Sequence, residues 1–328
     1  MKKIGILGGG VWGCALAKLL SVNNKVCIYA RDEKIVASIN DYKFNPKLKY
    51  STFNDNVSST KNINDLDELD YFLITIPSQN IREVLKNLKI RNTDHQIIIA
   101  SKGIEISSNF FLSEVVDETL KSKNINVLSG PCFSHEVVQN LPTAVTLATN
   151  NKNNFDQISE LFQSKNFRLY FSDDLIGCQL GGSIKNIYAI ATGISNGLNL
   201  GENAKSALIA RSFAEILRLG KVLNVQTNTL FGLSGLGDLI LTCNSLKSRN
   251  TYFGHLIASQ PQVNIEDHLK SQPTTEGYYT IKAVKNIAEK NNVNMPIMNS
   301  IYDILYNKAD IKNKISELLE RPIKAEFE

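Results

Sequence analysis

A short apolar segment that runs directly into a glycine-rich turn is the feature that most constrains the fold of this chain. Residues 3–7 read KIGIL and residues 8–13 read GGGVWG, and an apolar helical pattern follows. Strand, G-x-G-x-x-G and helix stand in the order that a dinucleotide-binding unit requires. Gly8 permits the tight turn, Gly10 lets a pyrophosphate approach the backbone, and Gly13 allows helix and strand to pack closely. The same glycines would also suit a tight turn in another kind of α/β protein.

Strand-like segments alternate with helical ones over the first half of the chain. They are expected at residues 25–30, 71–76, 97–101, 126–128, 144–148 and 167–171, with a helix at 154–164. The stretch 40–68 between the second and third strands is polar and rich in Asn. This alternation is typical of a sheet with helical crossovers. We therefore predict an α/β, Rossmann-type NAD(P)-binding domain over residues 1–180.

The alternation stops after residue 180, and the remaining segments read as helices. They are expected at residues 183–196, 203–222, 249–259, 276–291, 297–307 and 311–320, with Gly, Pro or Asn between them. A chain of 328 residues is also longer than one hydrophobic core usually supports. We therefore predict that residues 181–328 form a second, all-α domain.

Composition excludes several classes of partner. The net charge is only +4 and no basic run exceeds a few residues, so nucleic acid is not expected to bind. The five cysteines are scattered without a CxxC pair, which favours a reducing compartment and argues against a zinc or other metal site. The apolar run after the first three residues is too short for a signal peptide, and no segment approaches a membrane span. We expect a cytoplasmic protein without membrane insertion.

Lys185 and Asn186 interrupt an otherwise apolar and small-residue helical pattern within residues 177–200. Ile184, Ile187 and their neighbours at helical spacing form a hydrophobic stripe beside the lysine. Burial disfavours the charged form and lowers a lysine pKa by up to about 3 to 5 units, which enables proton exchange near neutral pH. The alternative is a lysine whose stem lies on apolar surface while its ammonium reaches water. Lys185 lies near the boundary of the two predicted domains, so proton exchange by this lysine would take place there.

Several further positions are candidates for binding anions. Arg31 follows the second strand, where an arginine can accept a 2′-phosphate, and Lys102 and Gly130 follow later strands at the edge where ligands bind. Residues 248–250, SRN, stand at an expected helix start, where guanidinium, amide and backbone N–H groups suit a phosphate. Solvated surface residues and an ordinary capped helix remain the alternatives for these positions.

The ordered set of motifs closely resembles bacterial glycerol-3-phosphate dehydrogenases. The set is GGGVWG at 8–13, PS at 77–78, SKG at 101–103, SGP at 129–131, QLGGSIKN at 179–186, GENAKSAL at 201–208, GLSGLGDL at 232–239, LTC at 241–243, SRN at 248–250 and TEGY at 275–278. The resemblance implies reversible hydride transfer between NAD(P)H and dihydroxyacetone phosphate, which gives sn-glycerol 3-phosphate for glycerophospholipid synthesis. It also implies that the all-α domain at 181–328 binds substrate and carries the catalytic groups, and that the chain forms a homodimer.

The resemblance also assigns roles to residues. Lys185 matches the catalytic lysine, and Asp238 matches an aspartate that can hold it through a charge-assisted hydrogen bond. The substrate-binding positions are Lys102, Gly130, Cys132, Ser248, Arg249 and Asn250. The cofactor-binding positions are Gly8, Gly10, Val11, Trp12, Gly13, Arg31, Lys102, Ser134, Arg249, Thr274 and Glu276. Arg31 favours NADPH as cofactor without excluding NADH.

Two departures and two alternatives accompany this interpretation. Val11 and Cys132 stand where the family commonly has hydroxyl residues. Val11 removes one polar contact from the phosphate turn, and Cys132 removes one from the substrate site.

A β-hydroxyacid-type dehydrogenase is the nearest rival, but it would need to recognise a carboxylate rather than a phosphate ester. A non-catalytic NAD(P)H-sensing protein would not need Lys185 and Asp238 together.

Overall fold

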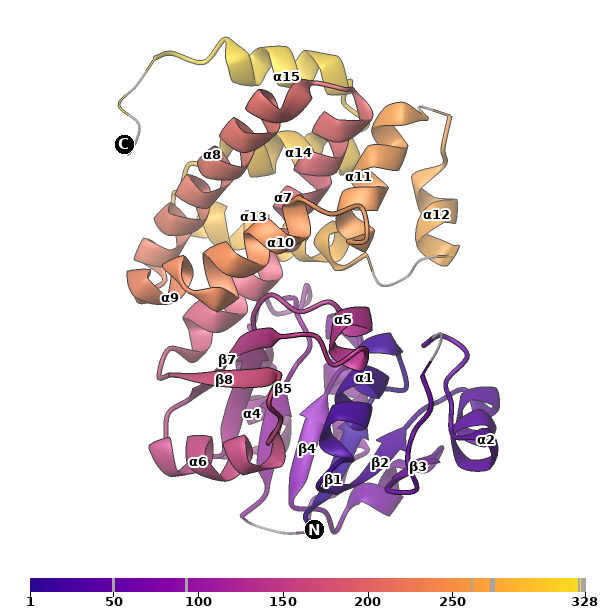
Figure 1. The fold of residues 1–328 in the computed structure, drawn as a ribbon. Coiled ribbons are helices and arrows are strands. Elements are labelled where there is room, and N and C mark those ends of the chain that lie inside the picture. Colours follow the sequence, from indigo (N-terminus) through magenta and orange to yellow (C-terminus); the bar gives the residue numbers. More distant parts are fainter. Residues whose placement is uncertain (49–50, 92–93, 261, 272–274, 324, 326–328) are drawn as a thin grey trace. The chain divides into compact units, whose positions relative to one another are not determined.

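The chain forms two compact units in the computed structural model (Figure 1). Unit 1 comprises Met1–Lys102 and Phe110–Gln179, and unit 2 comprises Gly103–Asn109 and Leu180–Glu328. The chain passes from one unit to the other within helix α7 (Leu175–Gly197). The structure describes residues 1–48, 51–91, 94–260, 262–271, 275–323 and 325.

Unit 1 is built on an eight-stranded sheet with the strand order β3-β2-β1-β4-β5-β6-β7-β8. The strands are β1 (Lys3–Leu7), β2 (Lys25–Tyr29), β3 (Val57–Thr60), β4 (Tyr71–Ile74), β5 (Gln96–Ile99), β6 (Ile125–Ser129), β7 (Thr143–Thr149) and β8 (Phe167–Ser172). Neighbouring strands are parallel except for β6 and β7, which pair antiparallel. The carboxyl ends of β1, β2, β4 and β5 therefore lie at one edge of the sheet.

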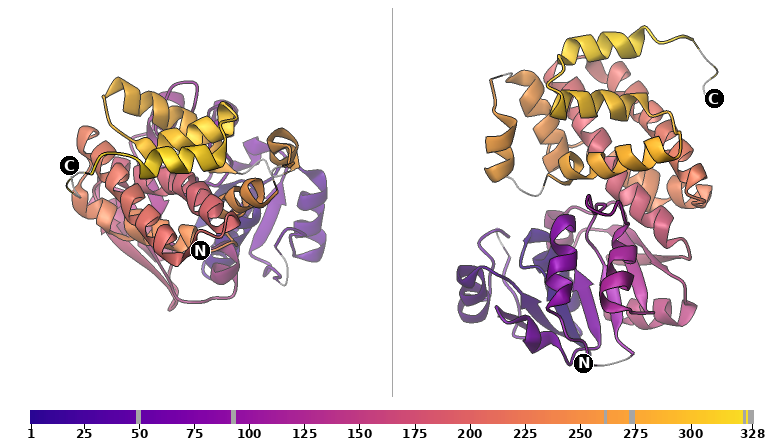
Figure 2. Two further views of the ribbon diagram at one scale, coloured as in Figure 1. Left: turned by 90° about the horizontal axis from the view of Figure 1, so that it is seen from above. Right: turned by 180° about the vertical axis from the view of Figure 1, so that it is seen from behind.

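Helices cover both faces of this sheet, as the two further views show (Figure 2). They are α1 (Val11–Leu20), α2 (Glu33–Tyr42), α3 (Ile81–Lys86), α4 (Leu112–Leu120), α5 (Ser134–Val138) and α6 (Lys152–Leu161), with the short 3₁₀ turns η1 (Ile63–Leu66) and η2 (Ser78–Asn80). One apolar cluster joins the sheet to α1, α2 and α6, and another joins it to α3 and α4. Because both faces are covered, β4 and β5 are buried along their whole length and read as continuous apolar runs.

Unit 2 is helical throughout its described secondary structure. Its elements are α7, α8 (Gly201–Val222), α9 (Thr227–Phe231), the π-helical turn η3 (Leu233–Gly237), α10 (Asp238–Cys243), α11 (Arg249–Ser259), α12 (Ile265–Ser271), α13 (Glu276–Lys290), α14 (Pro296–Tyr306) and α15 (Ile311–Leu319). No helix in the described part of the chain has the length and apolar character needed to cross a membrane. The predicted order, an α/β sheet domain followed by helices, is confirmed.

Three local expectations differ from the structure. The Asn-rich stretch 40–68 contains β3, an edge strand of sequence VSST that pairs only with β2 and carries no apolar signal of its own. Helix α7 begins at Leu175, well before residue 183, because its glycines are tolerated inside a packed helix. The segment 235–238, which falls between two of the expected helices, is helical as well, since the π-helical turn η3 continues directly into α10.

Candidate active site

The glycine-rich turn after β1 combines two crowded positions with one open position. A side chain at Gly13 would place its Cβ 2.1 Å from the carbonyl oxygen of Gly8, and Gly8 itself has a φ of +131°. A Cβ at Gly8 would also lie 2.7 Å from the hydroxyl of Thr75 at the end of β4. A Cβ at Gly10 would meet nothing within 4 Å. Gly8 and Gly13 therefore serve packing, and Gly10 leaves room for a ligand to approach the backbone.

The first turn of α1 offers backbone donors to an anion. Gly10 is the N-cap and makes no side-chain cap hydrogen bond, and Val11, the first helical residue, is 38% exposed. The N–H groups of a first turn have no partner within the helix and carry the positive end of its dipole. A dinucleotide pyrophosphate fits this position, since the valine in place of serine removes no backbone donor.

Trp12 holds this turn to the sheet. Its indole Nε1 donates a hydrogen bond to the carbonyl oxygen of Ala100, just beyond β5, at 3.0 Å. The ring is partly buried against the core cluster that contains α1. Trp12 therefore fixes the glycine turn relative to the segment that carries Lys102.

Arg31 lies beyond the end of β2, and its side chain is exposed. The neighbouring Asp32 caps helix α2 by accepting a hydrogen bond from the backbone N–H of Lys34 at 3.0 Å. Arg31 lines a polar cavity of about 500 Å³ that Lys61 and residues of α3 also border. A cationic rim of this kind suits a phosphate on the ribose of a nucleotide.

Predicted substrate-site residues converge at the ends of β5 and β6. The Nζ of Lys102 donates to the carbonyl oxygen of Gly130 at 3.1 Å, and the thiol of Cys132 contacts the same oxygen at 3.3 Å. Gly130 has a φ of +150°, and a Cβ there would lie 2.9 Å from Cα of Val145. Glycine is required at this turn, which the sequence pattern SGP indicated. Ser134 follows closely as the first residue of α5 and is partly buried.

Lys185 is buried in unit 2 beside two oxygen acceptors. The residue is 7% exposed, and its Nζ donates to Oδ1 of Asp238 at 2.5 Å and to the hydroxyl of Thr242 at 2.7 Å. Asp238 is fully buried, and the Thr242 hydroxyl donates to its backbone carbonyl at 2.6 Å. The alternative of a lysine that reaches into open water is therefore wrong, and the predicted pairing of Lys185 with Asp238 is present.

Close backbone approach brings Asp238 to Lys185. A Cβ at Gly181 of α7 would lie 2.5 Å from the carbonyl oxygen of Ser234 in η3. A Cβ at Gly235 would lie 2.0 Å from the carbonyl oxygen of Leu230. Gly181 thus lets the π-helical turn pack against α7, and Gly235 lets it pack against Leu230 of α9, after which α10 begins at Asp238. Single π turns of this kind are frequent at functional sites.

Thr242 is a site residue that the sequence interpretation missed. It stands four residues after Asp238, so both side chains lie on one face of α10. The motif LTC contained it, and the i, i+4 spacing from the aspartate was the available signal. Burial raises the pKa of the adjacent Cys243 thiol to about 12, so that thiol stays protonated at neutral pH.

Ser248 and Arg249 begin α11 as predicted. The Ser248 hydroxyl caps the helix by accepting from the backbone N–H of Thr251 at 3.3 Å. Arg249 is the first helical residue and is exposed overall. Partial burial lowers the pKa of its guanidinium, and the nearby Glu276 carboxylate acts in the opposite direction. Arg249 and Glu276, both predicted cofactor positions, thus lie close enough to interact.

Asn250 is buried and ties three helices together. Its Nδ2 donates to Oδ1 of Asn186 on α7 at 3.0 Å, and its Oδ1 accepts from the backbone N–H of Gly277 on α13 at 3.0 Å. A Cβ at Gly277 would lie 2.4 Å from the Asn186 carbonyl oxygen. Asn250 therefore positions the start of α11 beside the helix that carries Lys185. Thr274, the remaining predicted cofactor residue, lies outside the described residues.

Comparison with known proteins identifies relatives over the whole chain. Family models described as the N-terminus and C-terminus of NAD-dependent glycerol-3-phosphate dehydrogenase match residues 3–155 and 174–316. A glycerol-3-phosphate dehydrogenase [NAD(P)+] from Clostridium botulinum is 41% identical over 100% of both chains. One from Erythrobacter litoralis is 39% identical over 99% of this chain and 98% of its own. The crystal structure of glycerol-3-phosphate dehydrogenase from Coxiella burnetii has a TM-score of 0.91 at 36% identity, covering 98% and 99% of the two chains.

Proposed function

The chain belongs to the NAD-dependent glycerol-3-phosphate dehydrogenase family, and we propose that Lys185 is the proton donor of its reaction. The enzyme reduces dihydroxyacetone phosphate to glycerol 3-phosphate with NAD(P)H, as a step of phospholipid biosynthesis. We assign nucleotide binding to unit 1 and proton transfer to unit 2. The single observation that supports the role of Lys185 is its buried contact with Asp238 and Thr242.

The reduction requires one hydride and one proton. Bound NAD(P)H supplies the hydride to the carbonyl carbon of the substrate. The carbonyl oxygen then carries the negative charge, and the Lys185 ammonium donates a proton to it, which gives the alcohol. Asp238 and Thr242 hold Nζ in one position, which would orient the proton donor toward the reacting oxygen of a bound substrate. In the reverse direction the neutral amine accepts the hydroxyl proton.

The substrate phosphate is proposed to bind at the start of α11. The Arg249 guanidinium presents paired N–H donors, and the first-turn amides carry the positive end of the helix dipole. Asn250 holds this helix start in place through its two hydrogen bonds. Lys102, Gly130 and Cys132 also remain proposed substrate-binding residues. This arrangement recognises a phosphate ester better than a carboxylate, which disfavours the β-hydroxyacid alternative.

The nucleotide is proposed to bind along the carboxyl edge of the sheet in unit 1. The open side of Gly10 and the first turn of α1 would hold the pyrophosphate, and Arg31 would meet a 2′-phosphate. This placement supports a preference for NADPH over NADH. Ser134 and Glu276 remain proposed cofactor contacts.

Assembly and location are also proposals. Family resemblance supports a homodimer, which sedimentation velocity at micromolar concentration tests directly. A cytoplasmic location is supported by the five cysteines, all of which are thiols.

The assay that tests the reaction follows the loss of reduced-nicotinamide absorbance with dihydroxyacetone phosphate. Unphosphorylated dihydroxyacetone and a carboxylate analogue of the same length serve as matched controls. We expect turnover with the phosphate ester and at least a hundredfold lower kcat/KM with either control. Equal rates with the carboxylate would replace this function by that of a hydroxyacid dehydrogenase.

A further inference from the structure

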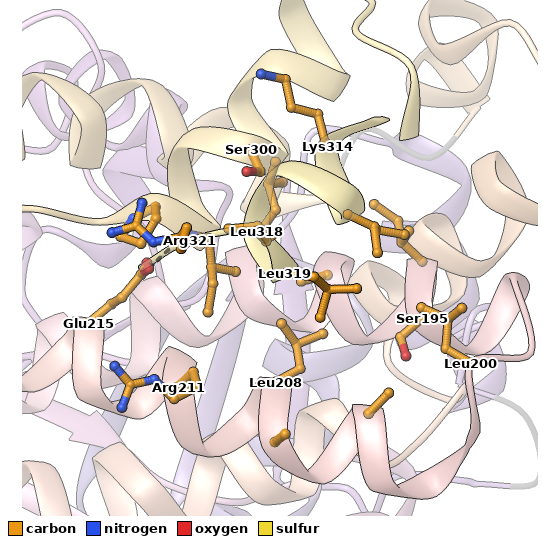
Figure 3. Close-up of a pocket in the computed structure, with 18 of the residues that line it drawn as sticks. Ser195, Leu200, Leu208, Arg211, Glu215, Ser300, Lys314, Leu318, Leu319 and Arg321 are labelled. Atoms are coloured by element: carbon orange, nitrogen blue, oxygen red, sulfur yellow. Dashed lines mark hydrogen bonds between the residues drawn. The ribbon is translucent and has the colours of Figure 1, made fainter. Parts of the chain in front are cut away.

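Two apolar surfaces of the molecule differ in what the chain itself places on them. In unit 2, an apolar groove of about 600 Å³ has Leu208 of α8 on one wall and Leu318 of α15 on the other, so apolar side chains of one chain already face one another there (Figure 3). In unit 1, β8 forms the end of the sheet, and within the described residues its only strand partner is β7. The outer edge of β8 therefore has room for a strand from another chain.

Strand β8 lacks the features that usually protect an edge strand. Tyr170 and Phe171 are 49% and 46% exposed. Natural edge strands are commonly protected by Pro, Lys, a bulge or a very short length. Strand β8 has the sequence FRLYFS and an uninterrupted register with β7, so it has none of these, although Arg168 gives it one charge. Such an edge is a template for pairing with another strand.

The direction of the backbone groups shows which residues of β8 are available for pairing. The N–H of Thr143 in β7 donates to the carbonyl oxygen of Asn166, just before β8, at 2.7 Å. Backbone groups point to alternate edges along a strand, so those of Arg168 and Tyr170 also point to β7. The residues whose N–H and C=O groups point to the outer edge are therefore Phe167, Leu169 and Phe171.

The side chains of β8 alternate between the two faces of the sheet. On one face Phe171 meets Phe155 of α6 edge-on, with ring centroids 5.4 Å apart. Leu169 shares this face and is only partly buried. The opposite face presents Arg168 and Tyr170, which are both exposed. Each face of β8 thus has side chains that a second strand would cover.

We propose that β8 pairs antiparallel with β8 of a second copy of the chain, with Leu169 on the two-fold axis, so that the two sheets join edge to edge. Every outward-pointing residue then lies in a hydrogen-bonded pair, because Leu169 meets itself and Phe167 meets Phe171 of the second copy. With Tyr170 on the axis instead, Phe167 would face Asp173, beyond the end of β8. This interface would be that of the homodimer proposed above, on which the pairing rests.

The side chains that meet in this pairing complement one another. Phe167 and Phe171 of the second copy form an aromatic pair on the face that carries α6. On the other face, Arg168 lies opposite Tyr170 of the second copy, where a guanidinium can stack on the ring. The two-fold axis repeats both pairs and sets no like charges opposite each other. A strand of another sequence would share the backbone hydrogen bonds but not these pairs, which favours a second copy as the partner.

Disulfide cross-linking tests the register. Arg168 and Tyr170 of the second copy form a non-hydrogen-bonded pair, in which Cα atoms lie about 4.5 Å apart, close enough for a disulfide. Mixing Arg168→Cys with Tyr170→Cys under mild oxidation should therefore give covalent dimers. Each variant alone should give at least about tenfold fewer, because diagonal neighbours lie about 7 to 8 Å apart. The parent, whose own cysteines are thiols, sets the background.

Sedimentation velocity across the micromolar range measures the dimer itself. Tyr170→Lys places a cation opposite Arg168 and should raise the dimer Kd by about tenfold or more. Leu169→Pro removes an N–H that points away from β7, so it should weaken the dimer similarly while β7 and β8 stay paired. Tyr42→Lys, at a tyrosine of α2 that is 71% exposed, is the control and should sediment as the parent does.

Three results would contradict the proposal. A parent that sediments as a monomer would exclude both the homodimer and this interface. A parent dimer that Tyr170→Lys does not weaken, or a cysteine mixture that cross-links no better than its single variants, would exclude the interface alone. Turnover of Tyr170→Lys with dihydroxyacetone phosphate should match the parent, because β8 carries no proposed ligand contact, so loss of the dimer is told apart from loss of the enzyme. Circular dichroism shows whether Leu169→Pro keeps its sheet, and Tyr170→Lys decides the question if it does not.

Discussion

The nucleotide turn of unit 1 and the lysine site of unit 2 are built in opposite ways. The turn after β1 offers backbone N–H groups around open space at Gly10, and the side chains near it mainly brace it. The lysine site consists of buried side chains that hold one another, with Lys185, Asp238 and Thr242 at its centre. A backbone site is encoded locally, whereas a side-chain site depends on how distant helices pack.

Glycine serves both sites, but differently. At Gly10 nothing of the protein lies within 4 Å of the missing Cβ, which leaves the space that the proposed nucleotide would need. Gly181 is small because the protein itself comes near, with the Ser234 carbonyl 2.5 Å from the missing Cβ. The same residue type thus marks an opening in one unit and a tight packing contact in the other. Substitutions should separate these two uses.

The largest effect is expected from Lys185→Ala. Removing the proton donor should lower kcat by at least about a hundredfold, because positioned acid catalysis contributes that much or more. NADPH affinity should be unchanged, because the Lys185 side chain is not part of the proposed nucleotide-binding turn. Stopped-flow turnover and equilibrium NADPH titration measure the two quantities. Lys290→Ala, an exposed lysine at the end of α13, is the control, and near-normal turnover in Lys185→Ala would refute the role.

A smaller effect is expected from Arg249→Ala. Loss of a charged contact to the substrate phosphate should raise KM for dihydroxyacetone phosphate by roughly 10- to 100-fold. The change in kcat should be smaller, because the guanidinium is proposed to bind substrate rather than to move a proton. Arg168→Ala, at an exposed position of unit 1, should leave KM as it is. An unchanged KM in Arg249→Ala would move the phosphate site away from α11.

The local structure around the candidate site was predicted well where one local pattern carries the constraint. The glycine turn, the SGP turn at Gly130 and the helix start at Ser248 are all local, and each lies where the sequence indicated. Thr242 was missed because its role depends on α10 meeting α7, 57 residues away in sequence. The bracing role of Asn250 was missed for the same reason, since its partners Asn186 and Gly277 lie on two other helices.

Gly10→Ala and Gly13→Ala sharpen the comparison within the turn. The Gly10 variant should fold normally, because its Cβ enters open space, and should bind NADPH roughly tenfold more weakly through lost backbone contact. The Gly13 variant should instead lose about 1 to 3 kcal/mol of stability or more, because its Cβ overlaps the Gly8 carbonyl. Urea unfolding and NADPH titration distinguish them. Equal loss of stability in both variants would show that Gly10 also serves packing.

Arg31→Ala should change cofactor preference only a few-fold. An exposed charge gains little in water, and Lys61 also borders the polar cavity and remains in the variant. The ratio of kcat/KM for NADPH to that for NADH should therefore fall, with the NADH value nearly constant. The double variant Arg31→Ala, Lys61→Ala should lower the ratio further. An unaltered ratio in both would show that neither cation meets the 2′-phosphate.

The fold was predictable for similar reasons. Strands such as β4 and β5 are buried on both faces, so their sequences are largely apolar and predict buried strands. Strand β3 lies at the sheet edge with alternating exposure and the sequence VSST, so its hydrogen bonds to β2 rather than its side chains define it. The antiparallel pairing of β7 with β6 likewise carries no signal in the sequence of either strand.

The smallest effect concerns Glu215, a buried acid of unit 2 that has no counterpart in the nucleotide turn. Burial raises the pKa of Glu215 above its usual 4.5, so the folded protein binds this proton more tightly than the unfolded chain does. The stabilisation that protonation gives is present below pH 4.5 and is lost as pH rises through the folded-state pKa. Glu215→Gln cannot titrate, so the stability of the parent relative to this variant should fall as pH rises from 4.5 through the folded-state pKa.

Urea unfolding at several pH values, followed by helix circular dichroism, measures this difference. Glu202→Gln, at an exposed position on the same helix, should give a pH profile that parallels the parent. A constant offset between Glu215→Gln and the parent would mean that hydrogen bonding from Tyr188, Ile297 and Met298 fully compensates for burial of the charge. If the stability profiles of Glu215→Gln and the parent instead converge or cross as pH changes, the charged Glu215 carboxylate destabilises unit 2. We would then infer that Glu215 is retained because it caps the start of α14.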